Sequence, residues 1–260
     1  MIKLIVSDID GTLVKDGDNV LNPEYFREIL RLRAKGIQFA AASGRQWHSI
    51  ERIFDPIKEK IFYISDNGAY VGCHGRNLFL TPIKRQLALE IVQEIRKNKE
   101  LDVVLSGPDV VYVETESQEL VHWLVDCYRF ELKQVPDVTK VPDEIIKVSA
   151  YKKHGVEEST KSIREKYQDQ LKITISGDMW MDCMASGVNK GAAIRMIQES
   201  LDILPEETMA FGDQLNDLEM MERAYYSYAI GNARPEVKAA ARFQADTNVN
   251  NGVLKVLQLL

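Results

Sequence analysis

The alternation of short apolar segments with helical segments is the feature that most constrains the fold of this chain. Five segments are short and almost wholly apolar: 2–7, 37–42, 61–65, 208–212 and 226–230. The segments with helical spacing or helix-start signals are 22–36, 46–53, 189–200, 217–224 and 235–241. A strand that is apolar on both faces is buried on both faces. The alternation therefore predicts an α/β fold, with a Rossmann-like parallel sheet covered by helices.

A second pattern interrupts the first between residues 82 and 184. Strand-like runs follow one another closely there: 102–106, 110–114, 145–151, 171–176 and 179–184. Two helical stretches, near 117–128 and 156–168, lie among them. This is an α+β pattern inserted into an α/β one. We predict a core domain of residues 1–81 and 185–260, and an inserted domain of residues 82–184.

Charge argues against two classes of partner, and cysteine content and the absence of long apolar stretches bear on location. The formal net charge is −6 and no basic run offsets it, which argues against binding to nucleic acid or to an anionic membrane. Three widely spaced cysteines are typical of reduced thiols. The first residues enter a strand without a secretion signal, and no stretch of eighteen apolar residues occurs. The expected location is cytoplasmic, and no pattern indicates an oligomeric state.

Two carboxylates follow the first strand directly. Asp8 and Asp10 come one residue apart, just before Gly11. Ligands of an open parallel sheet bind beyond the carboxyl ends of its strands, so this pair is expected to face a crevice. By itself, the segment 8–11 could equally be a turn without a functional role. A calcium-binding EF-hand is excluded, because an EF-hand loop has its glycine at the sixth position and is flanked by a helix. Here the glycine, Gly11, is at the fourth position counted from Asp8, and a predicted strand precedes the loop.

Three later segments place further polar groups after strands or at helix starts. They contribute Ser43 and Gly44 after 37–42, Lys190 at the start of 189–200, and Asp213, Asn216 and Asp217 after 208–212. Each alone could be a turn, a solvated lysine or a favourable first-turn acid. Together with Asp8 and Asp10, these segments bring a hydroxyl, a cation and four acids to one edge of the sheet. Carboxylate oxygens suit Mg²⁺, which usually binds through one or two carboxylates and a phosphate oxygen.

With these residues the chain resembles the haloacid dehalogenase-like phosphatase superfamily, in its Cof-type branch. The matching motifs, in order and spacing, are Asp8-x-Asp10-Gly11-Thr12, Ser43-Gly44-Arg45, Lys190 and Gly212-Asp213-x-x-Asn216-Asp217. Segments 65–70, 231–241 and 247–257 are also similar to the branch. The gap between the second and third motifs is where this branch carries its C2-type α/β cap. One departure is Ala185-Ser186, where relatives often have a proline.

The resemblance implies a phosphatase that hydrolyses a small phosphomonoester through an aspartyl-phosphate. Asp8 would be the nucleophile, and Asp10 the general acid and then the general base. A sugar phosphate is the expected substrate, although flavin or pyridoxal phosphate also remains open. The implied partner is thus a small phosphorylated metabolite, recognised in part by the cap.

The resemblance also implies a role for each remaining motif residue. Mg²⁺ would be held by Asp8, Asp10, Asp213 and Asp217, with Asp10 contributing its backbone carbonyl. The phosphate would be bound by Thr12, Ser43, Gly44, Lys190 and Asn216, and Thr12 would also hydrogen-bond its loop or Asp8. The resemblance further implies that Arg45 and Asn67 lie at the substrate entrance.

Two alternative functions remain open from the sequence. A phosphotransferase or phosphomutase of the same superfamily would share the aspartyl-phosphate. Mutases of the β-phosphoglucomutase type, however, insert a helical cap between the first two motifs, and only the short segment 12–42 separates Gly11 from Ser43. A non-enzymatic phospho-receiver also uses acids, Mg²⁺ and a lysine, but receivers are far shorter and lack a cap.

Overall fold

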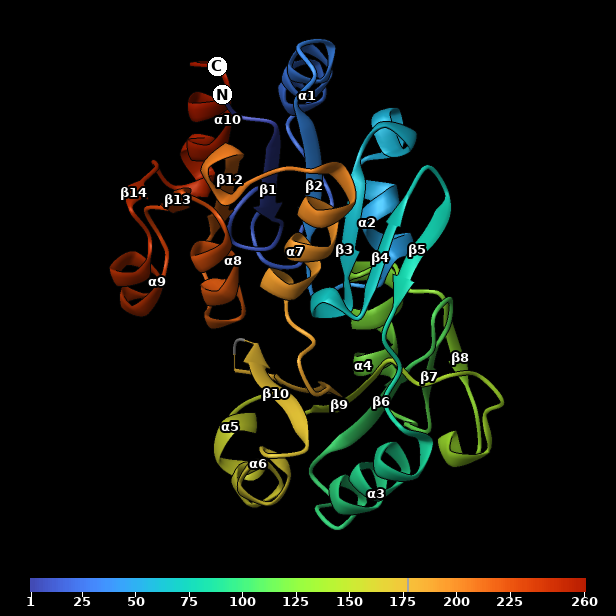
Figure 1. Ribbon diagram of the computed structural model, residues 1–260. Coiled ribbons are helices and arrows are strands. Elements are labelled where there is room, and N and C mark those ends of the chain that lie inside the picture. Colours follow the sequence, from blue (N-terminus) through green and yellow to red (C-terminus); the bar gives the residue numbers. More distant parts are fainter. Residues whose placement is uncertain (177) are drawn as a thin grey trace. The chain divides into compact units, whose positions relative to one another are not determined.

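The computed structural model describes residues 1–176 and 178–260 and contains two compact units (Figure 1). Unit 1 consists of Met1–Leu78 and Asn189–Leu260, and unit 2 of Phe79–Val188. No helix among the described residues is long and apolar enough to cross a membrane.

Unit 1 is built on an eight-stranded sheet. Its strands, in spatial order, are β14 (Phe243–Gln244), β13 (Tyr226–Ala229), β12 (Thr208–Gly212), β1 (Leu4–Asp8), β2 (Gln38–Ala42), β3 (Phe62–Ser65), β4 (Tyr70–Cys73) and β5 (Arg76–Leu80). The strands from β14 to β3 are parallel, which confirms the predicted parallel core. The hairpin partner β4 runs antiparallel to β3 and was not predicted.

Strand register brings the motif loops to one edge of this sheet. Asp8, the last residue of β1, is paired with Ala42, the last residue of β2. On the other side of β1, Ser7 is paired with Phe211 near the end of β12. The loops that follow these three strands therefore leave the sheet side by side.

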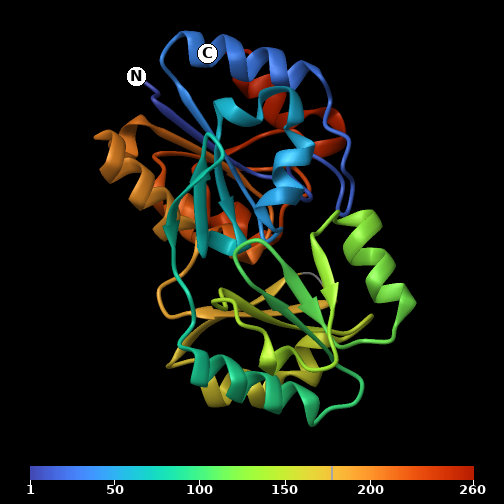
Figure 2. The same ribbon diagram turned by 90° about the vertical axis from the view of Figure 1, so that its right-hand side faces the viewer.

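Both faces of the central strands are buried. Leu4 and Val6 point to one face of β1 and Ile5 to the other, and all three are inaccessible to solvent. One hydrophobic cluster joins the Ile5 face to α1 (Glu24–Ala34) and α10 (Gly252–Leu257). The pair formed by α7 (Lys190–Leu201) and α8 (Leu218–Arg223) covers the opposite face (Figures 1 and 2). This two-sided burial is why the strand sequences are almost wholly apolar.

Asparagine side chains accept backbone hydrogen bonds at the start of two of these helices. Asn22 Oδ1 accepts a bond of 3.0 Å from the N–H of Glu24, the first residue of α1. Asn189 caps α7, because its side chain accepts a bond of 2.7 Å from the N–H of Ala192. Caps of this kind satisfy N–H groups that have no partner inside the helix. The remaining α-helices of this unit are α2 (Trp47–Ile53) and α9 (Pro235–Ala240).

Unit 2 contains a six-stranded, mostly antiparallel sheet. The strands, in spatial order, are β10 (Leu171–Ser176), β11 (Trp180–Ala185), β9 (Lys147–Tyr151), β6 (Asp102–Ser106), β7 (Val111–Val113) and β8 (Leu132–Gln134). Only β7 and β8 run parallel among the paired strands described. The helices α3 (Arg85–Arg96), α5 (Val156–Ser159) and α6 (Lys161–Tyr167) pack against this sheet around a common core.

The helices of unit 2 differ from the prediction in three ways, one of which is that the helical stretch expected near 156–168 divides at Thr160 into α5 and α6. Helix α3 was not predicted, although Ala88, Ile91, Val92 and Ile95 recur at helical spacing and are all buried. The single helix expected over 117–128 is instead α4 (Gln118–His122) followed by a π-helical turn over 123–127. This segment packs on the sheet through a second cluster that includes Leu120 and Leu124.

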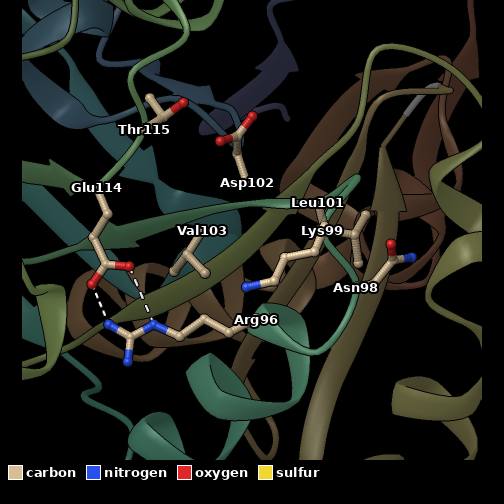
Figure 3. A pocket seen from close by; sticks show the side chains of 8 residues that line it. All are labelled: Arg96, Asn98, Lys99, Leu101, Asp102, Val103, Glu114 and Thr115. Atoms are coloured by element: carbon tan, nitrogen blue, oxygen red, sulfur yellow. Dashed lines mark hydrogen bonds and ion pairs between the residues drawn. The ribbon is translucent and has the colours of Figure 1, made fainter.

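A hollow of about 280 Å³ lies on unit 2 beside the end of α3 (Figure 3). The guanidinium of Arg96 is paired there with Glu114 and, at 2.8 Å, with Asp137. Glu114 also accepts a bond of 2.6 Å from the N–H of Val138. Arg96, Glu114 and Asp137 thus neutralise one another, and their ion pairs join α3 to the residue that follows β7. We therefore assign the hollow no ligand.

Candidate active site

The loop after β1 folds back on itself at Gly11. Its φ is +81°, which glycine adopts without strain, and the N–H of Leu13 donates to the carbonyl of Ile9 at 2.9 Å. A Cβ atom at Gly11 would lie 2.3 Å from Asp213 Oδ2. The absence of a side chain at this position therefore lets the fourth motif approach the first.

Three carboxylates meet at the edge of the sheet. Oxygens of Asp8, Asp213 and Asp217 all lie within 4.8 Å of one another, and the three residues are buried. Asp217 Oδ2 accepts bonds from the backbone N–H groups of Asp213, at 2.9 Å, and Gln214, at 3.0 Å. These bonds fix the loop after β12. Thr12 Oγ1 donates to Asp213 Oδ1 at 2.8 Å, which fixes that side chain as well.

Lys190 supplies a buried cation to this cluster. Its side chain is fully inaccessible, and its ammonium donates to Asp8 Oδ1 at 2.5 Å and to Asp217 Oδ1 at 2.7 Å. Burial opposes the charged ammonium, but the attraction of Asp217 and Asp8 outweighs it and raises the pKa of Lys190. The lysine is therefore charged, and it joins the first motif to the fourth.

The carboxylates remain in excess of the single lysine. Burial raises the pKa of Asp8 well above its ordinary value; Lys190 opposes this shift, and Asp217 and Asp213 add to it. Burial and the Asp217 charge likewise raise the pKa of Asp213 to about 7. Burial and mutual repulsion thus oppose ionisation of all three carboxylates, and a further cation would reduce that repulsion.

The donor set fits a divalent cation. Asp8 Oδ2 is buried and has no hydrogen-bond partner among the residues that the structure describes. A buried carboxylate oxygen without a partner is unfavourable unless a cation compensates it. Oxygen ligands from Asp8, Asp213 and Asp217 are of the kind that Mg²⁺ prefers.

The carboxylate of Asp10 lies outside this cluster. It pairs with the guanidinium of Arg45, whose Nε donates to Oδ2 at 2.8 Å and whose Nη2 donates to Oδ1 at 2.6 Å. The Arg45 side chain is 2% exposed. Both predicted residues are thus near the site, but Arg45 faces Asp10 from within the protein and does not lie on an exposed rim.

The second motif gathers the remaining predicted residues. Ser43 Oγ lies 3.5 Å from Asp10 Oδ2 and accepts a bond of 3.1 Å from the N–H of Arg45. The carbonyl of Ser43 accepts from the N–H of Asn67 at 3.0 Å, and the Asn67 side chain accepts from Asn216 Nδ2 at 2.9 Å. A Cβ on Gly44 would lie 3.3 Å from Asn67 Oδ1. The second motif, Asn67 and Asn216 therefore form one connected group.

Two asparagines that the sequence analysis did not assign hold the first loop. Asn232 Nδ2 donates to the carbonyl of Gly11 at 2.8 Å, and Asn248 Nδ2 donates to that of Val14 at 3.1 Å. The N–H of Asn248 also donates to Asn232 Oδ1 at 3.1 Å. Both asparagines belong to segments that were noted as similar to the Cof-type branch, which was the available signal.

Comparison with known proteins gives a consistent result. The profile of the haloacid dehalogenase-like hydrolases matches residues 5–257. The chain is 26% identical over 257 residues to the 5-amino-6-(5-phospho-D-ribitylamino)uracil phosphatase YbjI of Escherichia coli, covering 98% of this chain and 95% of that one. It is also 26% identical over 288 residues to the phosphatase YwpJ of Bacillus subtilis, covering all of both chains.

A solved structure agrees with this family. A crystal structure of a Eubacterium rectale protein superimposes with a TM-score of 0.89 at 38% identity, covering 99% of this chain and 98% of that one. The chain belongs to the haloacid dehalogenase-like hydrolases, in the Cof-type branch, and is an enzyme that acts as a phosphatase on phosphoric monoesters.

Proposed function

We propose that the chain hydrolyses a small phosphomonoester in two transfers, through an aspartyl-phosphate on Asp8. The observation that carries this proposal is the buried Asp8 carboxylate, which has Lys190 on Oδ1 and, among the residues that the structure describes, no partner on Oδ2. Lys190 holds Oδ1 in place, while Oδ2 has no described partner, so the carboxylate can still interact with a cation or a phosphoryl group. Splitting the hydrolysis into two transfers replaces one difficult step by two easier ones.

The residues of the acidic cluster would hold the cofactor. Asp8, Asp213 and Asp217 are proposed to bind Mg²⁺, with the backbone carbonyl of Asp10 as a further ligand. The ion would offset the negative charge of the phosphoryl group and of the buried carboxylates. Thr12, which bonds to Asp213, is proposed to orient that carboxylate.

Bond formation and proton transfer are divided between the first two aspartates. An oxygen of Asp8 would attack phosphorus as the bond to the leaving oxygen breaks, and Asp10 would give that oxygen a proton. In the second transfer, water would attack the same phosphorus, release Asp8 and return a proton to Asp10. Ser43, Gly44, Lys190 and Asn216 are proposed to hold the phosphoryl oxygens, where charge accumulates.

A sugar phosphate or sugar-alcohol phosphate is the substrate class that we propose. The Escherichia coli relative YbjI and the Bacillus subtilis relative YcsE are both named for a phosphoribitylaminouracil substrate, which carries its phosphate on a sugar alcohol. We propose that unit 2 acts as the cap that selects the organic part. A chimera that carries another relative's residues 82–184 should change its preferred ester and still hydrolyse acetyl phosphate. Unchanged preference would assign selection to unit 1.

The direct test is turnover and trapping with the purified protein. A panel of sugar, sugar-alcohol, flavin and pyridoxal phosphates in Mg²⁺ should give the highest kcat/KM for a sugar or sugar-alcohol phosphate. Acid quenching followed by intact mass should show one added phosphoryl group, which Asp8→Asn loses. The exposed Asp169 offers a matched control, because Asp169→Asn changes the same chemical group far along the chain.

Two outcomes would contradict the proposal. Phosphorylation without steady release of phosphate would indicate a receiver, and transfer of phosphate to a second sugar hydroxyl would indicate a mutase. An Asp8→Asn protein that kept the added mass would show that another residue is the nucleophile.

A further inference from the structure

Arg45 donates two parallel hydrogen bonds to the Asp10 carboxylate, in a bidentate arrangement. Its Nε donates to Oδ2 at 2.8 Å and its Nη2 donates to Oδ1 at 2.6 Å. This two-point arrangement fixes the plane of a carboxylate as well as its position, which a single ammonium cannot do. Arg45 is 2% exposed and Asp10 is 22% exposed, so solvent reaches the aspartate more easily than the arginine.

Further hydrogen bonds hold the guanidinium and the backbone of Arg45. Nη1 donates to Asn19 Oδ1 at 2.7 Å, and Nη2 also donates to the carbonyl of Asp18 at 2.9 Å. The carbonyl of Arg45 accepts a bond of 3.0 Å from the N–H of Asp66. All three guanidinium nitrogens thus have protein acceptors. Such an arrangement suits orientation of a neighbour better than recognition of a substrate.

The two oxygens of Asp10 are in different surroundings. Oδ1 accepts from Arg45 and also from the N–H of Gly17 at 3.2 Å. Oδ2 accepts from Arg45 and lies 3.5 Å from the hydroxyl of Ser43, a residue proposed to hold the phosphoryl group. Oδ1 is therefore the more firmly anchored oxygen, and Oδ2 lies next to the Ser43 hydroxyl.

We propose that Arg45 is a positioning residue for the acid–base function of Asp10. This inference rests on the proposed function. Arg45 keeps Oδ1 fixed through Nη2, while the Nε bond to Oδ2 is released when Oδ2 carries the proton. That proton passes from Oδ2 to the leaving oxygen as the phosphorus–oxygen bond breaks. In the second transfer, Oδ2 takes a proton from the attacking water as the bond between Asp8 and phosphorus breaks.

The consequence is a dependence on the leaving group. An alkoxide such as a sugar oxygen leaves poorly without a proton, whereas acetate leaves easily from acetyl phosphate. Loss of Arg45 should therefore mimic loss of Asp10. Acid–base assistance typically contributes about 10²–10⁴-fold, and a mispositioned acid should lose part of that, roughly 10–100-fold, on sugar phosphates. Phosphorylation by acetyl phosphate should change little.

The experiment compares Arg45→Met, Arg45→Lys and Asp10→Asn on glucose 6-phosphate and acetyl phosphate. Single-turnover phosphorylation is followed by quenched flow, and kcat and KM are measured separately. Arg45→Met should lower the phosphorylation rate on the sugar phosphate selectively, with KM nearly unchanged. Arg45→Lys should recover part of the loss, because one hydrogen bond can be restored. Adding Arg45→Met to Asp10→Asn should cause no further loss, since the two residues act together.

Two controls separate this role from a structural one. Arg27 is exposed and pairs with Glu24 on α1, so Arg27→Met should have wild-type kinetics on both esters. Asn19→Ala removes one anchor of the guanidinium but neither bond to Asp10, and should produce a smaller loss with the same leaving-group dependence. Thermal unfolding midpoints identify variants that fold. If Arg45→Met does not fold, Arg45→Lys provides the same comparison of the two esters.

The outcomes distinguish the inference from the proposed function. Equal losses on both esters, or losses that add to those of Asp10→Asn, would overturn the positioning role and leave the phosphatase mechanism standing. A wild-type protein that forms no phosphorylated intermediate from either ester would overturn both.

Discussion

Thr12 donates a hydrogen bond of 2.8 Å to Asp213, a residue 201 positions further along the chain. Both side chains are buried, and Gly11 beside Thr12 allows the close approach of the same carboxylate. The hydroxyl was expected to bind the phosphate, its own loop or Asp8. Its position in the structure instead connects the first motif to an acid proposed to bind Mg²⁺.

Thr12→Val should therefore weaken Mg²⁺ binding more than substrate binding. Removing one partner of a buried hydrogen bond costs about 1–3 kcal/mol, which corresponds to roughly tenfold or more in an equilibrium constant. Titration of activity with Mg²⁺ at saturating substrate should show a higher half-saturating concentration, and Thr12→Ser should restore it. A higher KM with an unchanged Mg²⁺ requirement would assign Thr12 to the phosphate instead.

Lys190→Met should destabilise unit 1 strongly. The change leaves the buried carboxylates of Asp8 and Asp217 without their shared cation, and breaking a buried ion pair typically costs about 3–5 kcal/mol. The thermal unfolding midpoint should fall by several degrees and recover in part with Mg²⁺. Lys161→Met, on exposed α6 surface, is the matched control. An unchanged midpoint without metal would show that the lysine contributes no net stability.

Gly11→Ala should abolish activity through a local collision. The new Cβ would lie 2.3 Å from Asp213 Oδ2, at a φ that alanine adopts poorly. Gly36 provides a close control, because its φ of +84° is similar and no atom lies within 4 Å of a Cβ there. Gly36→Ala should cost about 1 kcal/mol of backbone strain and keep full kcat. Equal losses of kcat in the two variants would point to backbone strain as the cause.

The metal-free protein should lose stability as the pH rises towards 7. The pKa of Asp213 is about 7 in the folded protein and 3.8 as its ordinary value, so the unfolded chain releases this proton first. The stabilisation is complete below about pH 4 and is lost as the pH passes through the folded pKa. Unfolding midpoints in EDTA should fall between pH 5 and pH 7.5, and Asp213→Asn should fall less.

Mg²⁺ should reverse this trend. A cation that binds the ionised carboxylates stabilises the folded state more at pH 7.5 than at pH 5, by about 2.7 kcal/mol when its concentration is a hundred times its dissociation constant. Melting curves at the two pH values, with and without Mg²⁺, provide the measurement. Equal stabilisation at both pH values would contradict the involvement of Asp213 in binding.

Local pattern was sufficient for the strands that carry the site. Strands β1, β2 and β12 lie where apolar runs predicted them, because a strand buried on both faces must be apolar throughout. Because parallel strands present their carboxyl ends at one edge of a sheet, the sequence also predicted that Asp8 and Asp213 lie close together. Helix α3 shows the limit of the interpretation, since its periodic apolar residues were present but were not assigned.

Partners within the site required the tertiary structure. Sequence alone predicted which residues gather at the edge of the sheet, since strand ends and residue chemistry are local properties. It did not predict that Arg45 turns inwards to Asp10, 35 residues away, or that Thr12 reaches Asp213. Those contacts depend on the conformations of the loops and on the register of the strands. Both are set only when β1, β2 and β12, which are distant in sequence, pair in one sheet. A hydrogen bond holds only over a few tenths of an ångström, so the packed fold decides it.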